Sequence, residues 1–236
     1  MLGGALALYS FDLMILAQSA AAWMCLIFAL FIVEPPYRRT EGVAERVRII
    51  EILRHLLHSD PILRQIVIAI PLYSLATFNA IWLIQPYWEA QGLSLAVFGV
   101  LWCAQSLTAA AATRFGFTVE KRFGAITALT IIGLLPIVAH FGMAWLQGWA
   151  GIAIALLLFA GRGLKQVILV NALNRRVPSE FRATANSITS FLFRLSFIVS
   201  GPVVGYVAQL KGLEVTLNLL GACYIVVFIV VMLPLI

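Results

Sequence analysis

The stretch Asn174–Ser187, NRRVPSEFRATANS, decides the fold because it is a charged island between two long apolar segments. It holds three arginines and one glutamate, whereas the segments at about 149–172 and 184–209 carry few charges. A polar turn between apolar runs of about twenty residues is typical of two consecutive membrane-spanning helices. Within the turn, Pro178 blocks the first helix. Ser179 is the predicted N-cap of the second, and Glu180 suits the positive end of that helix.

The rest of the chain repeats this pattern. Of its 236 residues, 62% are apolar and only 11% charged, with a mean hydropathy of +1.00. Soluble domains carry about 25% charged residues, so the composition excludes a soluble enzyme. Helices are predicted because backbone groups in lipid must be satisfied internally. Seven segments can each cross the roughly 30 Å of hydrocarbon: about 13–33, 65–87, 93–113, 124–146, 149–172, 184–209 and 214–236. The predicted fold is an all-α integral membrane protein with about seven transmembrane helices.

The distribution of Lys and Arg predicts the orientation. Successive connections, flanks included, hold 6, 0, 3, 0, 3 and 1 of these residues. Basic connections stay on the cytoplasmic side of the membrane, so the C-terminus is predicted to be cytoplasmic and the host membrane to be the cell membrane. The net charge of +6 therefore reflects topology, and no nucleic-acid partner is expected.

The longest connection, 34–63, is predicted to be a cytoplasmic linker that contains an amphipathic helix. In VAERVRIIEILRHLLH, apolar residues recur at helical spacing on one face: Val43, Val47, Ile50, Leu53 and Leu57. A basic amphipathic helix of this kind lies along a membrane surface. Asp60 and Pro61 then supply a cap and a first-turn proline for the next helix.

Several stretches resemble the major facilitator superfamily of transporters. SGPVVGYVAQLKG (200–212) resembles its Gly-Pro-x-x-Gly helix motif, and Arg182-Ala183-Thr184-Ala185-Asn186-Ser187 resembles the loop between its tenth and eleventh helices. IWLIQPYWEAQGLSLAVFG (81–99) is similar to the seventh helix and the start of the eighth, and FIVEPPYRR (31–39) to the exit of the sixth. The resemblance implies the C-terminal half of a two-bundle transporter, with helices six to twelve.

The resemblance also implies a division of the chain and a set of marker residues. Residues 1–33 would hold the tail of helix five and helix six, 34–63 the linker, and 64–236 a C-terminal six-helix bundle. Arg182 and Thr184 carry the loop motif, and the helix-packing residues would be Gly201, Pro202 and Gly205. A second cytoplasmic loop signature is matched by Gly116, Glu120 and Lys121, but the next glycine of that signature, Gly124, comes one residue late.

Three cations lie inside predicted spans: Arg162, Lys165 and Arg194. Burying such a residue costs at least about 2.5 kcal/mol, so each is a candidate for the transport cavity. No Asp or Glu lies in the interior of a predicted span, since Glu214 stands at the very start of the last one. The cations would therefore meet an anionic substrate or carboxylates of an N-terminal half. In the alternative, Lys165 reaches the cytoplasmic interface and Arg162 bonds backbone carbonyls.

A second candidate group combines amides and aromatic rings, which suit a pocket for an organic solute. It consists of Asn79, Trp82, Gln85, Trp102 and Gln105. In the alternative, the amides hold helices together. Trp88 is predicted to be an interfacial anchor.

These patterns predict a truncated or half-size secondary transporter that moves a small organic solute by alternating access between two helix bundles. It is expected to be inactive without a partner, which would be an N-terminal half or a second copy. A non-transporting membrane scaffold is the alternative. No catalytic residue, cofactor or metal is predicted, because the cysteines are isolated in separate spans and no Gly-x-Ser-x-Gly motif is present.

Overall fold

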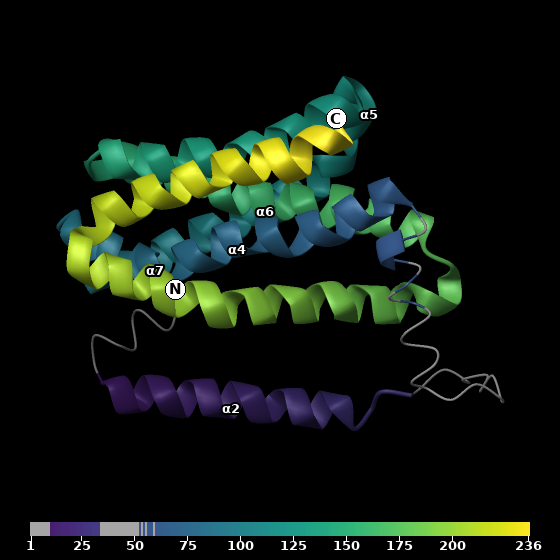
Figure 1. The fold of residues 1–236 in the computed structure, drawn as a ribbon. Helices are drawn as coiled ribbons and strands as arrows, with labels where there is room; N and C mark the ends of the chain where they lie inside the picture. Colours follow the sequence, from purple (N-terminus) through teal and green to yellow (C-terminus); the bar gives the residue numbers. More distant parts are fainter. Residues whose placement is uncertain (1–9, 34–51, 53, 55, 59) are drawn as a thin grey trace.

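The computed structural model describes residues 10–33, 52, 54, 56–58 and 60–236. Every regular element in these ranges is helical (Figure 1). The elements are α2 (Phe11–Ala29), α4 (Pro61–Ala90), α5 (Leu95–Trp145), α6 (Gly148–Arg176), the 3₁₀ turn η1 (Ser179–Phe181), α7 (Arg182–Val227), the π-helical turn η2 (Phe228–Met232) and the 3₁₀ turn η3 (Leu233–Leu235). The prediction of an all-helical chain is confirmed for this part of the molecule.

Five of the described helices are long and apolar enough to cross a membrane, as judged by length and composition. Four of them, α4 to α7, form a bundle, and α2 lies apart from it in Figure 1. The side chains of α2 are exposed along nearly its whole length. The bundle therefore does not cover the apolar surface of α2.

Two glycines interrupt the longest helices. Gly124 in α5 has φ 84° and ψ 162°, and Gly212 in α7 has φ 82° and ψ 170°. Positive φ is accessible to glycine at little cost, and it ends a helix without a loop. Figure 1 shows the chain reversing where the green part of α7 gives way to the yellow C-terminal segment. The connections predicted at 114–123 and 210–213 are accordingly helical up to these glycines.

The interior of the bundle consists of two clusters at successive levels of α4 and α6. One contains Leu63, Ile132 and Leu173, and the other contains Ile84 and Leu158. Gly163 brings α5 and α6 together: a Cβ on it would lie 2.8 Å from Ala112 Cβ and would also meet the Ala109 carbonyl oxygen. Small residues allow such close backbone approach between membrane helices.

The described part of the linker packs against the bundle. Ile52 and Leu56 are helical and fully buried in the first cluster, and Leu57 is only half-buried. Of the predicted apolar face, Leu57 is the residue described here, and Val43, Val47, Ile50 and Leu53 lie outside the described residues.

The predicted cap at the start of α4 is confirmed. The Asp60 carboxylate accepts a hydrogen bond from the Ile62 amide at 2.9 Å. The same carboxylate pairs with Arg176 at 2.7 Å, which ties the start of α4 to the end of α6.

The predicted N-cap of α7 is wrong. Ser179 opens the 3₁₀ turn η1, and α7 begins only at Arg182, with Phe181 before it and no side-chain cap. Pro178 does end the preceding helix, since the last residue of α6 is Arg176. The turn is held instead by Asn186, whose side-chain amide donates to Asn174 Oδ1 at 2.7 Å. This bond joins the end of α6 to the first turn of α7, and α7 begins without a side-chain cap.

Candidate functional site

A groove of about 290 Å³ lies between α4, α6 and α7, and two of the predicted cations line it. From α6 it receives Arg162, Lys165 and Gln166. Ser74 and Phe78 come from α4. We call this the cationic groove. It combines two cations, Arg162 and Lys165, with two aromatic side chains, Phe78 and Phe193.

Lys165 is buried at the wall of the cationic groove, with 7% of its surface exposed. Its Nζ donates a hydrogen bond to Ser74 Oγ at 2.7 Å, and the Ser74 hydroxyl donates in turn to the Ile70 carbonyl at 2.6 Å. The alternative in which Lys165 extends to the cytoplasmic interface is therefore wrong. The lysine faces α4 instead.

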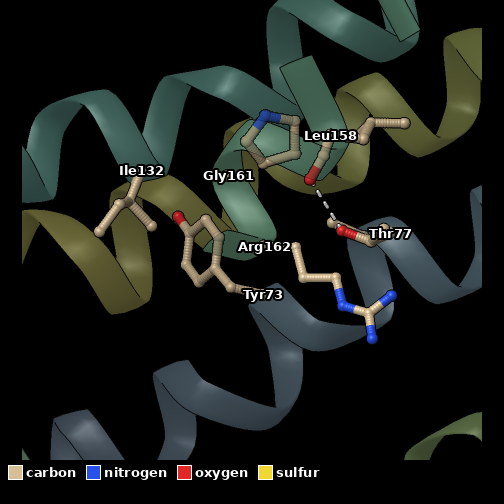
Figure 2. Close-up of a pocket in the computed structure, with 8 residues that line it drawn as sticks. Tyr73, Thr77, Ile132, Leu158, Gly161 and Arg162 are labelled. Carbon is tan, nitrogen blue, oxygen red and sulfur yellow. Dashed lines mark hydrogen bonds between the residues drawn. The ribbon is translucent and has the colours of Figure 1, made fainter. Parts of the chain in front are cut away.

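Arg162 lies one turn before Lys165, on the same face of α6. Its side chain is exposed and lines both the cationic groove and a small adjoining cavity of about 10 Å³. Figure 2 shows the guanidinium extending past Thr77, away from Tyr73 and Ile132. Thr77 fixes the wall at this point, because its hydroxyl donates to the Leu158 carbonyl at 3.0 Å and so links α4 to α6. In the alternative, Arg162 would donate to backbone carbonyls, and no such hydrogen bond is found among the described residues.

No carboxylate neutralises either cation within the described ranges. The ion pair found there joins Arg176 to Asp60, at the far end of α6 from the groove. The groove is therefore electropositive.

Aromatic side chains continue the groove along α4 and α7. The Phe78 ring meets Phe193 and Phe197 edge-on, with centroid distances of 5.1 and 4.5 Å. Trp82 stacks on Phe197 at 6.2 Å and an interplanar angle of 20°. With 64% of its surface exposed, Trp82 presents the other face of its indole outward. We call Phe78, Trp82, Phe193 and Phe197 the aromatic wall.

Arg194 is separate from the other two cations. It lines a different, more open groove of about 400 Å³ with Asn186, Ser190 and Phe191. Its side chain is exposed, on α7. The structure thus brings together Arg162 and Lys165 and leaves Arg194 apart.

The amide and tryptophan candidates are also divided. Asn79 and Gln105 are buried, and Asn79 Oδ1 and Gln105 Oε1 have no hydrogen-bond partner among the described residues. Trp102 is half-buried and packs on Trp88 with a centroid distance of 5.8 Å, while Gln85 is exposed. Of the five candidates, Trp82 is the one that belongs to the aromatic wall.

Trp88 is not the interfacial anchor predicted from the sequence. It is fully buried and packs on Phe98 at a centroid distance of 5.0 Å.

The two loop motifs that the resemblance marks lie near the ends of helical segments. Gly116 is buried where a Cβ would lie 3.4 Å from Leu164 of α6, with Glu120 half-buried and Lys121 exposed. Arg182 Nε donates to the Val177 carbonyl at 3.3 Å, so this arginine braces the turn before α7. Thr184 lines an apolar groove and is not among the residues that line the cationic groove. Among the described residues, no cluster of three or more His, Cys, Asp or Glu side chains forms a metal site.

The Gly-Pro-x-x-Gly segment does not pack closely on another helix within the described chain. A Cβ on Gly205 would have nothing within 4 Å, and the nearest atoms to one on Gly201 belong to the Phe197 ring of its own helix. Pro202 is exposed inside α7. The close helix contact that was expected here occurs at Gly163 instead.

Sequence reasoning missed Ser74, Thr77 and Phe78. A signal was present, because Ser74, Phe78 and Trp82 recur every four residues and so lie on one face of a helix. The sequence does not show which face of α4 meets Lys165. The row formed by Ser74, Phe78 and Trp82 therefore could not be distinguished from ordinary helix packing.

Comparison with known proteins supports a transporter-like character. The chain is 26% identical over 152 residues to an uncharacterised transporter of the major facilitator type from Salmonella typhimurium. The match covers 64% of this chain and 37% of the relative, so the chain spans well under two thirds of that protein's length. No family model matches the chain, and no solved structure matches it.

Proposed function

We propose that the chain is a truncated or half-size secondary transporter of the major facilitator type. It would move a small organic solute by alternating access and would be inactive without a partner half. The distant similarity to a transporter and the apolar helices support this proposal. The observation that carries it is the cationic groove, in which Arg162 and Lys165 lie within helical spans without a described carboxylate to neutralise them.

The proposal includes seven membrane crossings. The positive-φ glycines in α5 and α7 support this count, because each divides a helix that is too long for one crossing. A crossing needs about 20 residues, whereas α5 has 51 and α7 has 46. With the basic connections on the inner side, the C-terminus would be cytoplasmic.

The proposal also predicts a second wall for the cavity. Arg162, Arg194 and Trp82 are exposed in this chain, and charged side chains within a membrane normally face protein or a water-filled cavity. A partner polypeptide, either an N-terminal half or a second copy, would cover the surface formed by α4, α6 and the first part of α7.

Photo-crosslinking in the cells that naturally make the chain tests this. A p-benzoylphenylalanine in place of Phe191, which is exposed beside Arg194, should join the chain to another apolar polypeptide or to a second copy. The matched control replaces Val226, which is equally exposed on the C-terminal segment at the opposite side of the bundle in Figure 1. This control should react with lipid alone. Lipid adducts alone from position 191, or the same protein adduct from both positions, would refute the partner half.

A further inference from the structure

We infer that the cationic groove binds a small organic anion with an aromatic body, whose carboxylate lies at Arg162 and Lys165 and whose ring lies against the aromatic wall. This inference rests on the proposed transport function and specifies the class of solute that would be carried.

The unused hydrogen-bond donors of the groove indicate that the ligand has an anionic group at one end. The Lys165 ammonium has three N–H donors, and one of them is used, toward Ser74 Oγ. Arg162 lines the same groove and makes no hydrogen bond to another described residue. Two cations three residues apart on one helix face repel each other. A carboxylate between them would relieve that repulsion and accept charge-assisted hydrogen bonds from both.

The spacing of aromatic residues along α4 indicates that the other end of the ligand is aromatic. Phe78 is one helical turn beyond Ser74, about 6 Å along the axis, and Trp82 is one turn further. The Phe78 and Phe193 side chains line the groove itself. A ligand whose charge is held beside Ser74 therefore places its apolar body against rings, which favour offset or edge-to-face contact with another ring.

The size of the groove limits the ligand. Pockets for drug-sized molecules have volumes of about 300–1,000 Å³, and the cationic groove has about 290 Å³. It therefore suits one ring with a short acidic side chain.

A carboxylate side chain of a partner polypeptide has the same charge as this ligand but no ring. A short aliphatic acid imitates such a side chain. Comparison of an aromatic acid with an aliphatic one therefore distinguishes the two sources.

Binding to the full-length chain, purified in nanodiscs of neutral lipid, tests the inference with three probes. These are 3-phenylpropanoate, its neutral analogue 3-phenylpropanamide, and propanoate, which lacks the ring. The Kd of 3-phenylpropanoate should be at least tenfold lower than that of either analogue. Equal binding of the amide would refute the anion site, and equal binding of propanoate would refute the aromatic one.

Substitutions locate the site. Arg162→Gln should raise the Kd of 3-phenylpropanoate at least tenfold and leave the amide unaffected; because Arg162 is exposed, the fold should tolerate the change. Lys211→Gln removes an exposed cation outside the groove and should leave the Kd unchanged. Phe78→Leu should weaken 3-phenylpropanoate without affecting propanoate. Equal Kd values for Arg162→Gln and the unsubstituted chain would overturn the inference.

The inference about binding and the proposed transport function can be refuted independently. Transport of other solutes without binding of 3-phenylpropanoate would overturn this inference alone. Binding without transport of any solute in native membranes would contradict the proposed function and leave the site standing.

Discussion

Lys165 of α6 donates a hydrogen bond to Ser74 of α4 at 2.7 Å, and this contact joins two helices through a buried ammonium group. The serine passes the bond on to the Ile70 carbonyl of its own helix. Arg162 of α6 lies beside Thr77 of α4. The contact between α4 and α6 therefore contains both cations of the groove and hydrogen bonds that hold its wall.

Removal of the Ser74 hydroxyl should destabilise the chain. Ser74→Ala leaves a buried ammonium without its acceptor, which should cost about 1–3 kcal/mol. Thermal unfolding in detergent measures this. Ser106→Ala is the matched control, because the Ser106 hydroxyl bonds only its own helix. In Ser74→Ala/Lys165→Met, loss of the charge should recover much of the stability. An unfolding temperature that Ser74→Ala leaves unchanged would show that the bond contributes nothing.

The Thr77 hydroxyl should stabilise the α4–α6 contact by a smaller amount. Thr77→Val removes its bond to the Leu158 carbonyl, and side-chain hydrogen bonds between membrane helices contribute about 0.6–1.7 kcal/mol. Thr130→Val is the control, since Thr130 bonds the Ile126 carbonyl of its own helix. If both variants lower the unfolding temperature equally, the interhelical bond has no special role.

Gly163 should tolerate no side chain. In Gly163→Ala the new methyl group would meet the Ala109 carbonyl and Ala112 of α5, and such overpacking costs about 1–3 kcal/mol. Gly205→Ala places a methyl group in open space and should be neutral or stabilising by up to about 1 kcal/mol. Unfolding temperatures of the two variants in detergent would check the contrast, and the reverse order would contradict this helix contact.

The orientation can be measured with single cysteines in a background in which Cys25, Cys103 and Cys223 are replaced. A cysteine at Ser179, in the basic turn before α7, should resist a membrane-impermeant maleimide in intact cells. A cysteine at Ser94, between α4 and α5, should react. Reaction at Ser179 with protection at Ser94 would invert the proposed topology.

Sequence patterns predicted that helices exist but could not predict which faces meet. Trp82 and Trp88 lie in the same apolar helix, yet Trp82 is mostly exposed and Trp88 is fully buried. A helix that is apolar all round gives no periodic signal for its packing face. The same limitation applies to the cations. Burial cost marked all three as candidates, and the spacing of three residues put Arg162 and Lys165 on one face of α6. Only the packing of α6 on α4 showed that Lys165 meets Ser74.

Loop lengths were also overestimated, for a physical reason. Charged residues at 114–123 indicated a connection, but charged side chains can sit at the end of a helix and extend into water. The helix therefore continues until Gly124, where a positive φ lets the chain turn.

Flux of labelled 3-phenylpropanoate into membrane vesicles tests the central claim most directly. The vesicles come from the cells that naturally produce the chain, so that any partner half is present. We predict saturable flux that falls at least tenfold in Arg162→Gln at unchanged membrane abundance, and that persists in Lys211→Gln, which removes a cation exposed beside Gly212. Equal flux with and without the Arg162 guanidinium, or no flux above that of membranes lacking the chain, would contradict transport of this solute through the cationic groove.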